Sequence, residues 1–175
     1  MVEGMDIYSV LERHGIAYRR YDHDAVYTCE EADRAVPPTG AAHTKNLFLR
    51  DKKGVRHWLL VTLCEKPVDL ARVAQRIGAD RLSLGSSERL QKHLGVTPGS
   101  VTILALINDP QHDVALLVDD EVWRADAVQA HPLVNTATLV ISQADIRRFL
   151  AATGHEPRVI NVARRTAPEP TLPPV

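Results

Sequence analysis

Three short segments combine polar or conformationally special residues with adjoining apolar runs, and they are where this sequence could do chemistry. The first is residues 43–46, His-Thr-Lys-Asn, which lead directly into an apolar run. Lys45, with Asn46 beside it, could project from a strand start into a pocket, where an ammonium group would hold a phosphate, a carbonyl or a developing oxyanion. The alternative is a solvated lysine at a strand edge, because most lysines are exposed.

The second segment is residues 95–100, which contain Gly95, Pro98, Gly99 and Ser100. Pro98-Gly99 suits a type II turn, and the backbone amides of such a turn can line a site for an anion or an oxyanion. The alternative is a plain connecting turn.

The third segment is residues 131–138, where one imidazole, one amide and two hydroxyls fall in a stretch without charged residues. His131, Asn135 and Thr136 could therefore build a small neutral pocket with a few directional hydrogen bonds. A histidine before a proline is alternatively a structural residue held by its hydrogen bonds. Periodicity and spacing alone stop short of a function.

The common catalytic signatures are missing from the sequence. It contains no G-x-G-x-x-G, G-x-x-x-x-G-K-[ST], G-x-S-x-G or H-E-x-x-H, which argues against nucleotide hydrolysis and standard serine hydrolysis. The eight histidines are scattered without metal-ligand spacing, so we expect no metal site. Cys29 and Cys64 form no C-x-x-C pair, and we expect both to be reduced packing residues.

Length and composition indicate one soluble globular domain. The chain has 175 residues, of which 45% are hydrophobic and 25% charged, enough to bury an aliphatic core. The net charge of −1 gives no protein-wide positive field, so a polyanion would have to bind a local patch. The sequence shows neither a membrane-spanning run nor a secretory signal, and we expect a cytoplasmic protein.

Apolar periodicity and capping residues predict the elements that must position these segments. Helices are expected at 7–14, from the Thr28/Glu31 capping box to Pro37, and at 70–77, 86–94 and 142–150. Short β-branched runs predict strands at 47–49, 58–63, 101–107, 114–118, 139–141 and 159–162. Residues 51–54 read as a hairpin loop, and residues 108–113 as an antiparallel connection.

These elements interleave without a strict β-α-β rhythm, which predicts a mixed α/β fold with a largely antiparallel sheet and helices around it. We expect one domain over residues 1–162. Residues 163–175 are rich in proline and have little to bury, so they are expected to form a disordered tail.

Four motifs occur in an order and at spacings that resemble the YbaK-like family of prolyl-tRNA editing domains. They are "HTKNLFLRD", "LGVTPGSVT" with the trailing "IND", "HPLVNTATL" and "GHEP". The resemblance covers about residues 5–162 and is closest to the free-standing bacterial proteins that hydrolyse alanine from mischarged alanyl-tRNA(Pro). It implies a mixed α/β fold with a mostly antiparallel, barrel-like central sheet surrounded by helices, and a reaction that needs no cofactor or metal.

The resemblance also implies residue roles. The family's essential lysine falls on Lys45, with Asn46 beside it, and its pocket histidine on His131. Amides of the loop at residues 95–100 would approach the ester carbonyl as oxyanion donors. Asn135 and Thr136 are candidates for pocket walls or for ordering the hydrolytic water. The candidates for a local basic face that holds the tRNA are Lys45, Arg50, Lys52, Lys53 and Arg81. The alternative is that all of them except Lys45 are simply solvated.

The expected activity is hydrolysis of alanyl-tRNA(Pro), with prolyl-tRNA(Pro) spared because proline is larger than alanine. The expected partners are the mischarged acceptor end of tRNA(Pro) and, transiently, prolyl-tRNA synthetase, but neither a membrane nor DNA. Two alternatives stay open. The substrate could carry cysteine or serine instead of alanine, or the chain could be a non-catalytic module that binds aminoacyl-tRNA or a synthetase.

Overall fold

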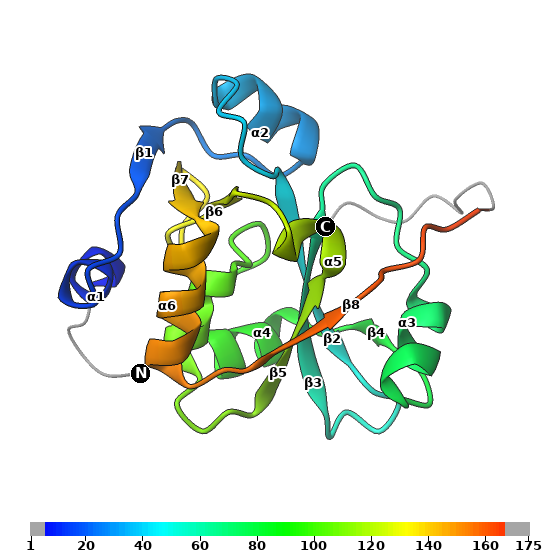
Figure 1. Ribbon diagram of the computed structural model, residues 1–175. Helices are drawn as coiled ribbons and strands as arrows, with labels where there is room; N and C mark the ends of the chain where they lie inside the picture. Colours follow the sequence, from blue (N-terminus) through cyan, green and yellow to red (C-terminus); the bar gives the residue numbers. More distant parts are fainter. Residues whose placement is uncertain (1–5, 167–175) are drawn as a thin grey trace.

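The computed structural model describes residues 6–166, which form two β-sheets with helices packed around them (Figure 1). The five-stranded sheet has the order β4-β2-β3-β5-β8, and the three-stranded sheet has the order β1-β7-β6. The strands are β1 (Arg19–Asp22), β2 (Thr44–Arg50), β3 (His57–Leu63), β4 (Ser83–Leu84), β5 (Val114–Asp119), β6 (Ala127–Ala130), β7 (Ala137–Ser142) and β8 (Pro157–Ile160). The helices are α1 (Ile7–Arg13), α2 (Cys29–Ala35), α3 (Leu70–Ile77), α4 (Ser87–Leu94), α5 (Asp120–Trp123), α6 (Gln143–Thr153) and the 3₁₀ helix η1 (Ile103–Asn108).

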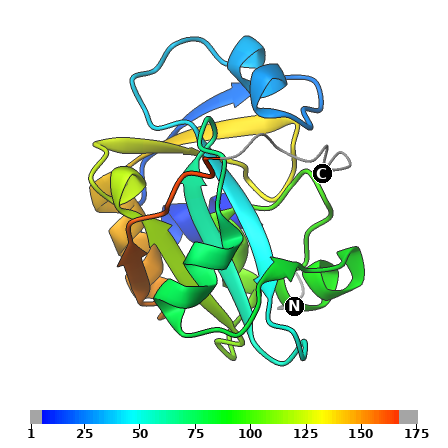
Figure 2. The same cartoon turned by 90° about the vertical axis from the view of Figure 1, so that its right-hand side faces the viewer.

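The two faces of the central strand β3 contribute to two separate apolar cores. Leu59 and Val61 face the larger core, which lies between the two sheets and includes residues of α1, α4, η1 and α6. Trp58 and Leu60 face the smaller core under α3, a helix that lies on the other side of the five-stranded sheet (Figure 2). Because β3 is covered on both faces, its sequence is a nearly continuous apolar run rather than an alternating one.

Most predicted helices form where their capping residues indicate. The Thr28 hydroxyl accepts a hydrogen bond from Glu31 N at 3.1 Å and begins α2. The Ser142 hydroxyl accepts a hydrogen bond from Asp145 N at 3.1 Å and begins α6. This helix continues to Thr153, past the predicted end at residue 150. The predicted hairpin at 51–54 is also confirmed, since β2 and β3 pair antiparallel on either side of it.

The predicted strand at 101–107 is wrong, because residues Ile103–Asn108 form a 3₁₀ helix. Thr102 caps it by accepting a hydrogen bond from Leu104 N at 3.2 Å. A short, continuous apolar run that is buried on every side cannot be assigned to a strand or a helix by periodicity alone. The antiparallel connection at 108–113 is therefore wrong too, since β5 pairs parallel with β3 and with β8.

The expected barrel-like arrangement is not confirmed, whereas the expected predominance of antiparallel pairing agrees with four of the six strand pairs. The three-stranded sheet is antiparallel throughout, but the five-stranded sheet is mixed. Over residues 6–166 the strands form two open sheets and no closed barrel. The mixed α/β class itself agrees with the structure.

Cys29 and Cys64 are joined by a disulfide with a Cα–Cα distance of 5.9 Å, so the expectation of two reduced cysteines is wrong. The bond ties the first residue of α2 to the residue after β3. The two cysteines are 35 residues apart. No local sequence pattern predicts the bond, because tertiary packing brings the two residues together.

The predicted tail boundary at residue 163 also differs from the structure. Asp69 N donates to Ala163 O at 3.1 Å, and Arg165 N donates to Pro67 O at 2.8 Å. Residues 163–166 therefore continue along the folded body, while residues 167–175 of the predicted tail lie outside the described residues. In the described part of the chain no helix is long and apolar enough to span a bilayer.

Candidate functional site

A pocket lies where the two sheets meet, at the start of β2. The segment before β2 pairs with β6, because Ala42 N donates to Ala127 O at 2.8 Å and Gln129 N donates to Ala42 O at 3.0 Å. The pocket leaves about 20 Å³ for the centre of a water molecule and is open to solvent at its mouth, which is more space than one internal water needs. Its lining residues are Ala32, His43, Thr44, Asn46, Gln129, Ala130, His131 and Thr138.

The imidazole of His131 contributes a hydrogen-bond acceptor to this pocket. Its Nδ1 lies 3.0 Å from Ala137 O, and a carbonyl oxygen only accepts, so Nδ1 carries the proton. Burial lowers the pKa of His131 below its ordinary value of 6.5, and the nearby His23 and His43 lower it further, against the opposing effect of the Ala137 bond. His131 is therefore neutral at pH 7, and its Nε2 has a free lone pair.

Thr138 is oriented in the same way by His23. The His23 Nδ1 lies 2.8 Å from Asp24 O and must donate to it, so in the neutral form of the ring Nε2 is an acceptor. That Nε2 lies 2.9 Å from Thr138 Oγ1, so the hydroxyl donates to His23. The lone pairs of Thr138 are then available to a ligand.

Two residues of β2 complete this set of acceptors. The Thr44 hydroxyl donates to Gln129 O at 2.9 Å, which leaves its own lone pairs available. Asn46 Oδ1 is buried and has no hydrogen-bond partner among the described residues. An unpaired buried acceptor costs about 1–3 kcal/mol, so this position favours a ligand that donates hydrogen bonds.

Helix α2 forms one wall of the pocket through Ala32. Asp33, the next residue, forms an ion pair with His43 when the imidazole is protonated. The disulfide fixes the start of the same helix, and Cys64 N donates to His43 O at 2.9 Å. The disulfide and the Asp33–His43 pair thus both hold this short helix over the pocket.

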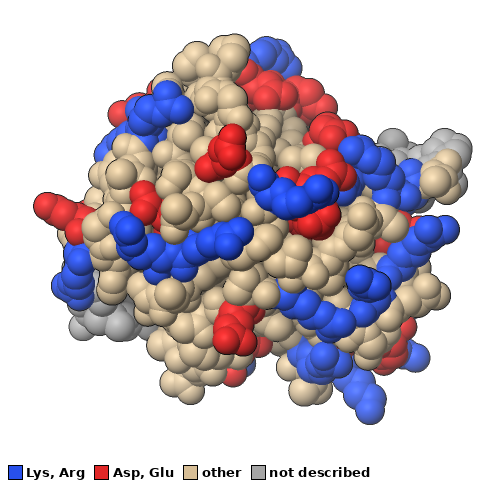
Figure 3. All heavy atoms as spheres, in the orientation of Figure 1, with Lys and Arg blue, Asp and Glu red and all other residues tan. Residues whose placement is uncertain are grey.

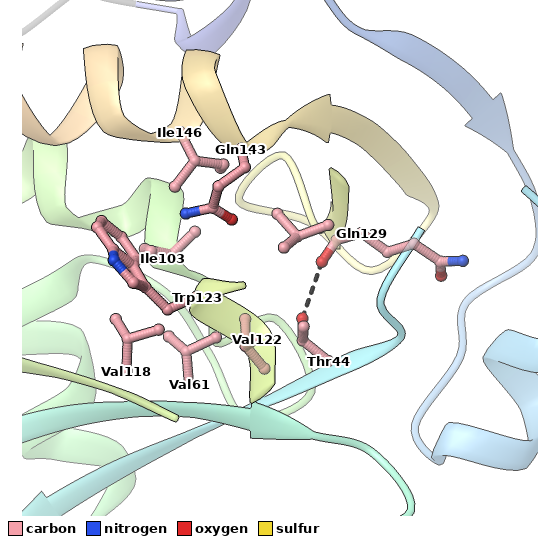
Figure 4. Close-up of a pocket in the computed structure, with 10 residues that line it drawn as sticks. Thr44, Val61, Ile103, Val118, Val122, Trp123, Gln129, Gln143 and Ile146 are labelled. Atoms are coloured by element: carbon pink, nitrogen blue, oxygen red, sulfur yellow. Dashed lines mark hydrogen bonds between the residues drawn. The ribbon is translucent and has the colours of Figure 1, made fainter. Parts of the chain in front are cut away.

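Behind this pocket lies a second, apolar cavity, which Figure 4 shows with its lining side chains. Thr44 and Gln129 line both spaces, so the hydrogen bond between them separates the two. Gln143 points into the cavity, and its amide nitrogen and oxygen have no partner among the described residues. The cavity leaves about 10 Å³ for the centre of a water molecule, close to what one internal water needs.

Lys45 is not among the residues that line the pocket. It lies directly opposite Thr62 across the β2–β3 pair, so these two side chains leave the same face of the sheet. Thr44 and Asn46 leave the other face, into the pocket, because side chains alternate along a strand. Lys45 is half-buried there and interacts electrostatically with Glu65.

Residues 95–100 also lie outside the pocket lining. Gly95 ends α4 in the left-handed conformation. Ser100 N donates to Thr97 O at 3.0 Å, and Gly99 has a φ of +88°, as the predicted type II turn around Pro98 requires. The turn comes close to the 131–138 segment, since a Cβ on Gly99 would lie 3.4 Å from Asn135 Nδ2.

Asn135 and Thr136 hold the loop rather than line the pocket. Asn135 Nδ2 donates to Val26 O at 2.9 Å. His23 N donates to Thr136 O at 3.0 Å. These bonds fasten the segment that carries His131 to the chain that precedes α2.

The other predicted tRNA contacts gather at the far end of β2. Arg50 is the last residue of that strand, Lys52 and Lys53 lie in the hairpin turn, and Arg81 precedes β4, whose Ser83 pairs with Arg50. Over the seven residues of β2, this end is about 20 Å from the pocket. Figure 3 shows basic side chains over the lower right of the molecule, where α3 and the hairpin lie.

Sequence reasoning missed several residues of the pocket. His43, Thr44 and Thr138 lie inside the segments that it singled out, and their position beside Asn46 or His131 is the signal that could have found them. Gln129 carries no such signal, because strand pairing alone brings it to the site, and neither does His23, which is outside the lining and reaches the site through Thr138. Among residues 6–166, no three His, Cys, Asp or Glu side chains are grouped to hold a metal ion.

Comparisons with known proteins agree on one family. The model of the aminoacyl-tRNA editing domain matches residues 23–149, which contain all three segments. Prolyl-tRNA editing protein ProX of Acetoanaerobium sticklandii is 35% identical over 152 residues, covering 87% of this chain and 93% of that protein. Prolyl-tRNA synthetase associated domain-containing protein 1 of Danio rerio is 35% identical over 153 residues, covering 86% and 83%.

A solved structure described as that of a candidate trans-editing enzyme for prolyl tRNA synthetase has a TM-score of 0.68 to this chain. It is 19% identical, and the match covers 91% of this chain and 96% of that one. At this identity the similarity supports the fold alone.

Proposed function

The chain belongs to the aminoacyl-tRNA editing domain family, and from this premise we propose that it hydrolyses the ester of alanyl-tRNA(Pro) that prolyl-tRNA synthetase has mischarged. Its relatives are named for prolyl-tRNA editing or for association with prolyl-tRNA synthetase. The observation that carries the proposal is a pocket whose polar atoms are mainly acceptors, among them an unpaired buried oxygen of Asn46.

This set of acceptors suits the α-ammonium group of an aminoacyl ester. A primary ammonium has three N–H donors, and Asn46 Oδ1, Thr138 Oγ1 and Thr44 Oγ1 offer it acceptors. A prolyl ester has a secondary ammonium with two N–H donors and a bulky ring. Both differences favour alanine over proline, and the small side chains of Ala32 and Ala130 in the lining fit a small amino acid.

Hydrolysis needs a water and a place for its proton. His131 is neutral with Nε2 unprotonated, so it can take a proton from the attacking water. The hydroxide oxygen adds to the ester carbonyl carbon, and the tetrahedral intermediate collapses by breaking the bond to the ribose oxygen. His131 returns the proton to that oxygen, which releases alanine and tRNA. The residue thus acts as base and then as acid.

The oxyanion would form at the mouth of the pocket. With the amino group inside, the ester carbonyl points outward, toward the turn at residues 95–100, which lies against Asn135. We assign backbone amides of this turn as oxyanion donors, each worth about 10²–10³ in rate. Gly95, Pro98, Gly99 and Ser100 belong to the proposal as residues that shape this turn.

Lys45 is proposed to bind the terminal phosphate of the RNA rather than the ester. It follows Thr44 and precedes Asn46 but leaves the opposite face of β2, so its ammonium group is separated from the interior of the pocket. A cation outside the pocket suits the phosphate that joins the last two nucleotides. The basic residues at the hairpin end are proposed to contact the acceptor stem further along.

A deacylation panel tests this function. Purified protein is incubated with tRNA(Pro) carrying alanine, cysteine, serine or proline, and ester loss is compared with spontaneous hydrolysis. We expect fast release of alanine and none of proline, with kcat reduced about 100-fold or more in His131→Ala and Asn46→Ala. Glu12→Gln, an exposed change on α1, is the matched control.

Three outcomes would contradict parts of the proposal. Preferred release of cysteine or serine would change the substrate, and tight tRNA binding without ester loss would make the chain a binding module. Undiminished turnover in Lys45→Ala would remove that residue from the site.

A further inference from the structure

Tyr27 is an exposed aromatic side chain at the edge of the candidate site. Its side chain is 60% exposed, and it immediately precedes Thr28, which caps α2. The backbone around it is fixed: Tyr27 N donates to Glu31 Oε2 at 2.7 Å, and Val26 O accepts from Asn135 at 2.9 Å. Tyr27 therefore presents a large aromatic ring to solvent from a fixed backbone.

The type II turn at residues 97–100 contacts one edge of the Tyr27 ring. A Cβ on Gly99 would lie 3.1 Å from Cδ1 of Tyr27, which is tighter than most Cβ contacts, and 3.4 Å from Cε1. Because Gly99 has no side chain, the ring can lie against the turn. The ring therefore rests on the turn at one edge and remains largely open elsewhere.

We propose that Tyr27 is a stacking platform for a nucleobase at the single-stranded acceptor end of the tRNA. This inference rests on the proposed function, which brings that end to the pocket. Unpaired bases at RNA ends are commonly recognised by stacking on aromatic side chains, and such stacking tolerates any base. The base would lie on Tyr27 while the aminoacyl group lies in the pocket beyond Asn135.

The charges around Tyr27 favour a base over a phosphate. Glu30 and Glu31 lie in the first turn of α2, and Asp33 follows in the same helix. These carboxylates repel the phosphate backbone, whereas a neutral base can approach the ring. The backbone must therefore turn away from α2, which agrees with the phosphate contact proposed for Lys45.

Tyr18 provides a matched comparison. It is 37% exposed and lies next to Tyr8, with ring centroids 5.7 Å apart. Its ring already has an aromatic neighbour within its own chain. Tyr27 instead contacts a backbone turn beside the site, so the two exposed tyrosines are not equivalent.

The test uses an uncharged RNA hairpin that mimics the acceptor stem and carries 2-aminopurine in place of its terminal adenine. Stacking on an aromatic ring quenches 2-aminopurine fluorescence. We expect the native protein to quench the probe, Tyr27→Phe to keep the quenching, and Tyr27→Ala to lose it. The affinity of Tyr27→Ala for the RNA should fall about 5- to 150-fold, whereas Tyr18→Ala should bind like the native protein.

A second variant keeps the test informative if truncation disturbs α2. Gly99→Ala pushes a methyl group toward the Tyr27 ring and, at a φ of +88°, also strains the turn in either background. It should therefore weaken binding in the native background and cause a smaller loss, due to the strain alone, when combined with Tyr27→Ala. Equal losses in both backgrounds would overturn the platform, as would unchanged quenching in Tyr27→Ala. Because the RNA carries no amino acid, these results are independent of the deacylation panel. Hydrolysis without Tyr27-dependent quenching would support the proposed function and contradict the stacking role of Tyr27.

Discussion

The directions of individual hydrogen bonds define the chemistry of the pocket at the scale of residues. The carbonyls of Asp24 and Ala137 accept from Nδ1 of His23 and His131, so in the neutral form of each ring the other nitrogen is an acceptor. Thr138 must then donate to His23, which leaves its lone pairs for a ligand. These backbone oxygens select the tautomers of His23 and His131, and the tautomers in turn leave acceptor atoms of His131 and Thr138 facing the pocket.

A pH profile tests this assignment at the residue scale. His131 must be neutral to take a proton, and burial lowers its pKa below 6.5. Activity should therefore be constant near pH 7 and fall only as the pH drops through that lowered pKa. His23 and His43 face His131, and Asp33 pairs with His43, so His131→Gln is compared with His43→Gln over the same range. The acid limb should vanish in His131→Gln alone, and its persistence there would contradict the role of His131.

At the scale of elements, α2 and β2 determine what the pocket contains. Helix α2 has seven residues, and a helix of that length is marginal without tertiary support. The disulfide at Cys29 and the Asp33–His43 pair supply that support. In β2, alternation places Asn46 in the pocket and Lys45 on the opposite face, so the proposed function gives these neighbouring residues contacts with different parts of the substrate.

The disulfide yields a prediction at this scale. Cys29→Ser removes a crosslink between residues 35 apart, which should cost about 2–4 kcal/mol of unfolding free energy. The melting temperature should fall by about 2–4 °C per kcal/mol, as followed by calorimetry or circular dichroism. Cys64→Ser should behave identically, and a reducing agent should shift the native protein but neither variant. A native melting temperature that is indifferent to reductant would show that the crosslink does not stabilise the fold.

At the scale of the whole molecule, the junction of two sheets separates two kinds of contact. The pocket lies where β6 meets the segment before β2, and the basic cluster lies at the hairpin end of the same strand, about 20 Å away. With a net charge of −1 the molecule has no general attraction for RNA. The RNA binding that we propose would therefore depend on the local cluster, whose distance from the pocket suits a duplex stem.

Salt dependence tests this arrangement. If Lys52 and Lys53 bind phosphates, changing both to glutamine should weaken binding to an acceptor-stem RNA. The slope of log K against log salt should then become shallower by about one for each phosphate that a lysine no longer neutralises. Filter binding or fluorescence anisotropy over a range of KCl concentrations measures the slope. Lys92→Gln, an exposed change on α4, is the control. An unchanged slope in the double variant would remove the hairpin from the RNA interface.

The sequence by itself determined the helices with strong caps, the β2–β3 hairpin and the family. The helices and the hairpin depend on residues close together in the chain, and the family is indicated by several short motifs that occur in a set order. It also pointed to Asn46 and His131. Only the tertiary structure decided that residues 103–108 coil instead of extending, that Cys29 meets Cys64, and that His23 orients Thr138. Each of these depends on contacts between distant parts of the chain, and local patterning has no information about which distant partner will satisfy a buried or polar group.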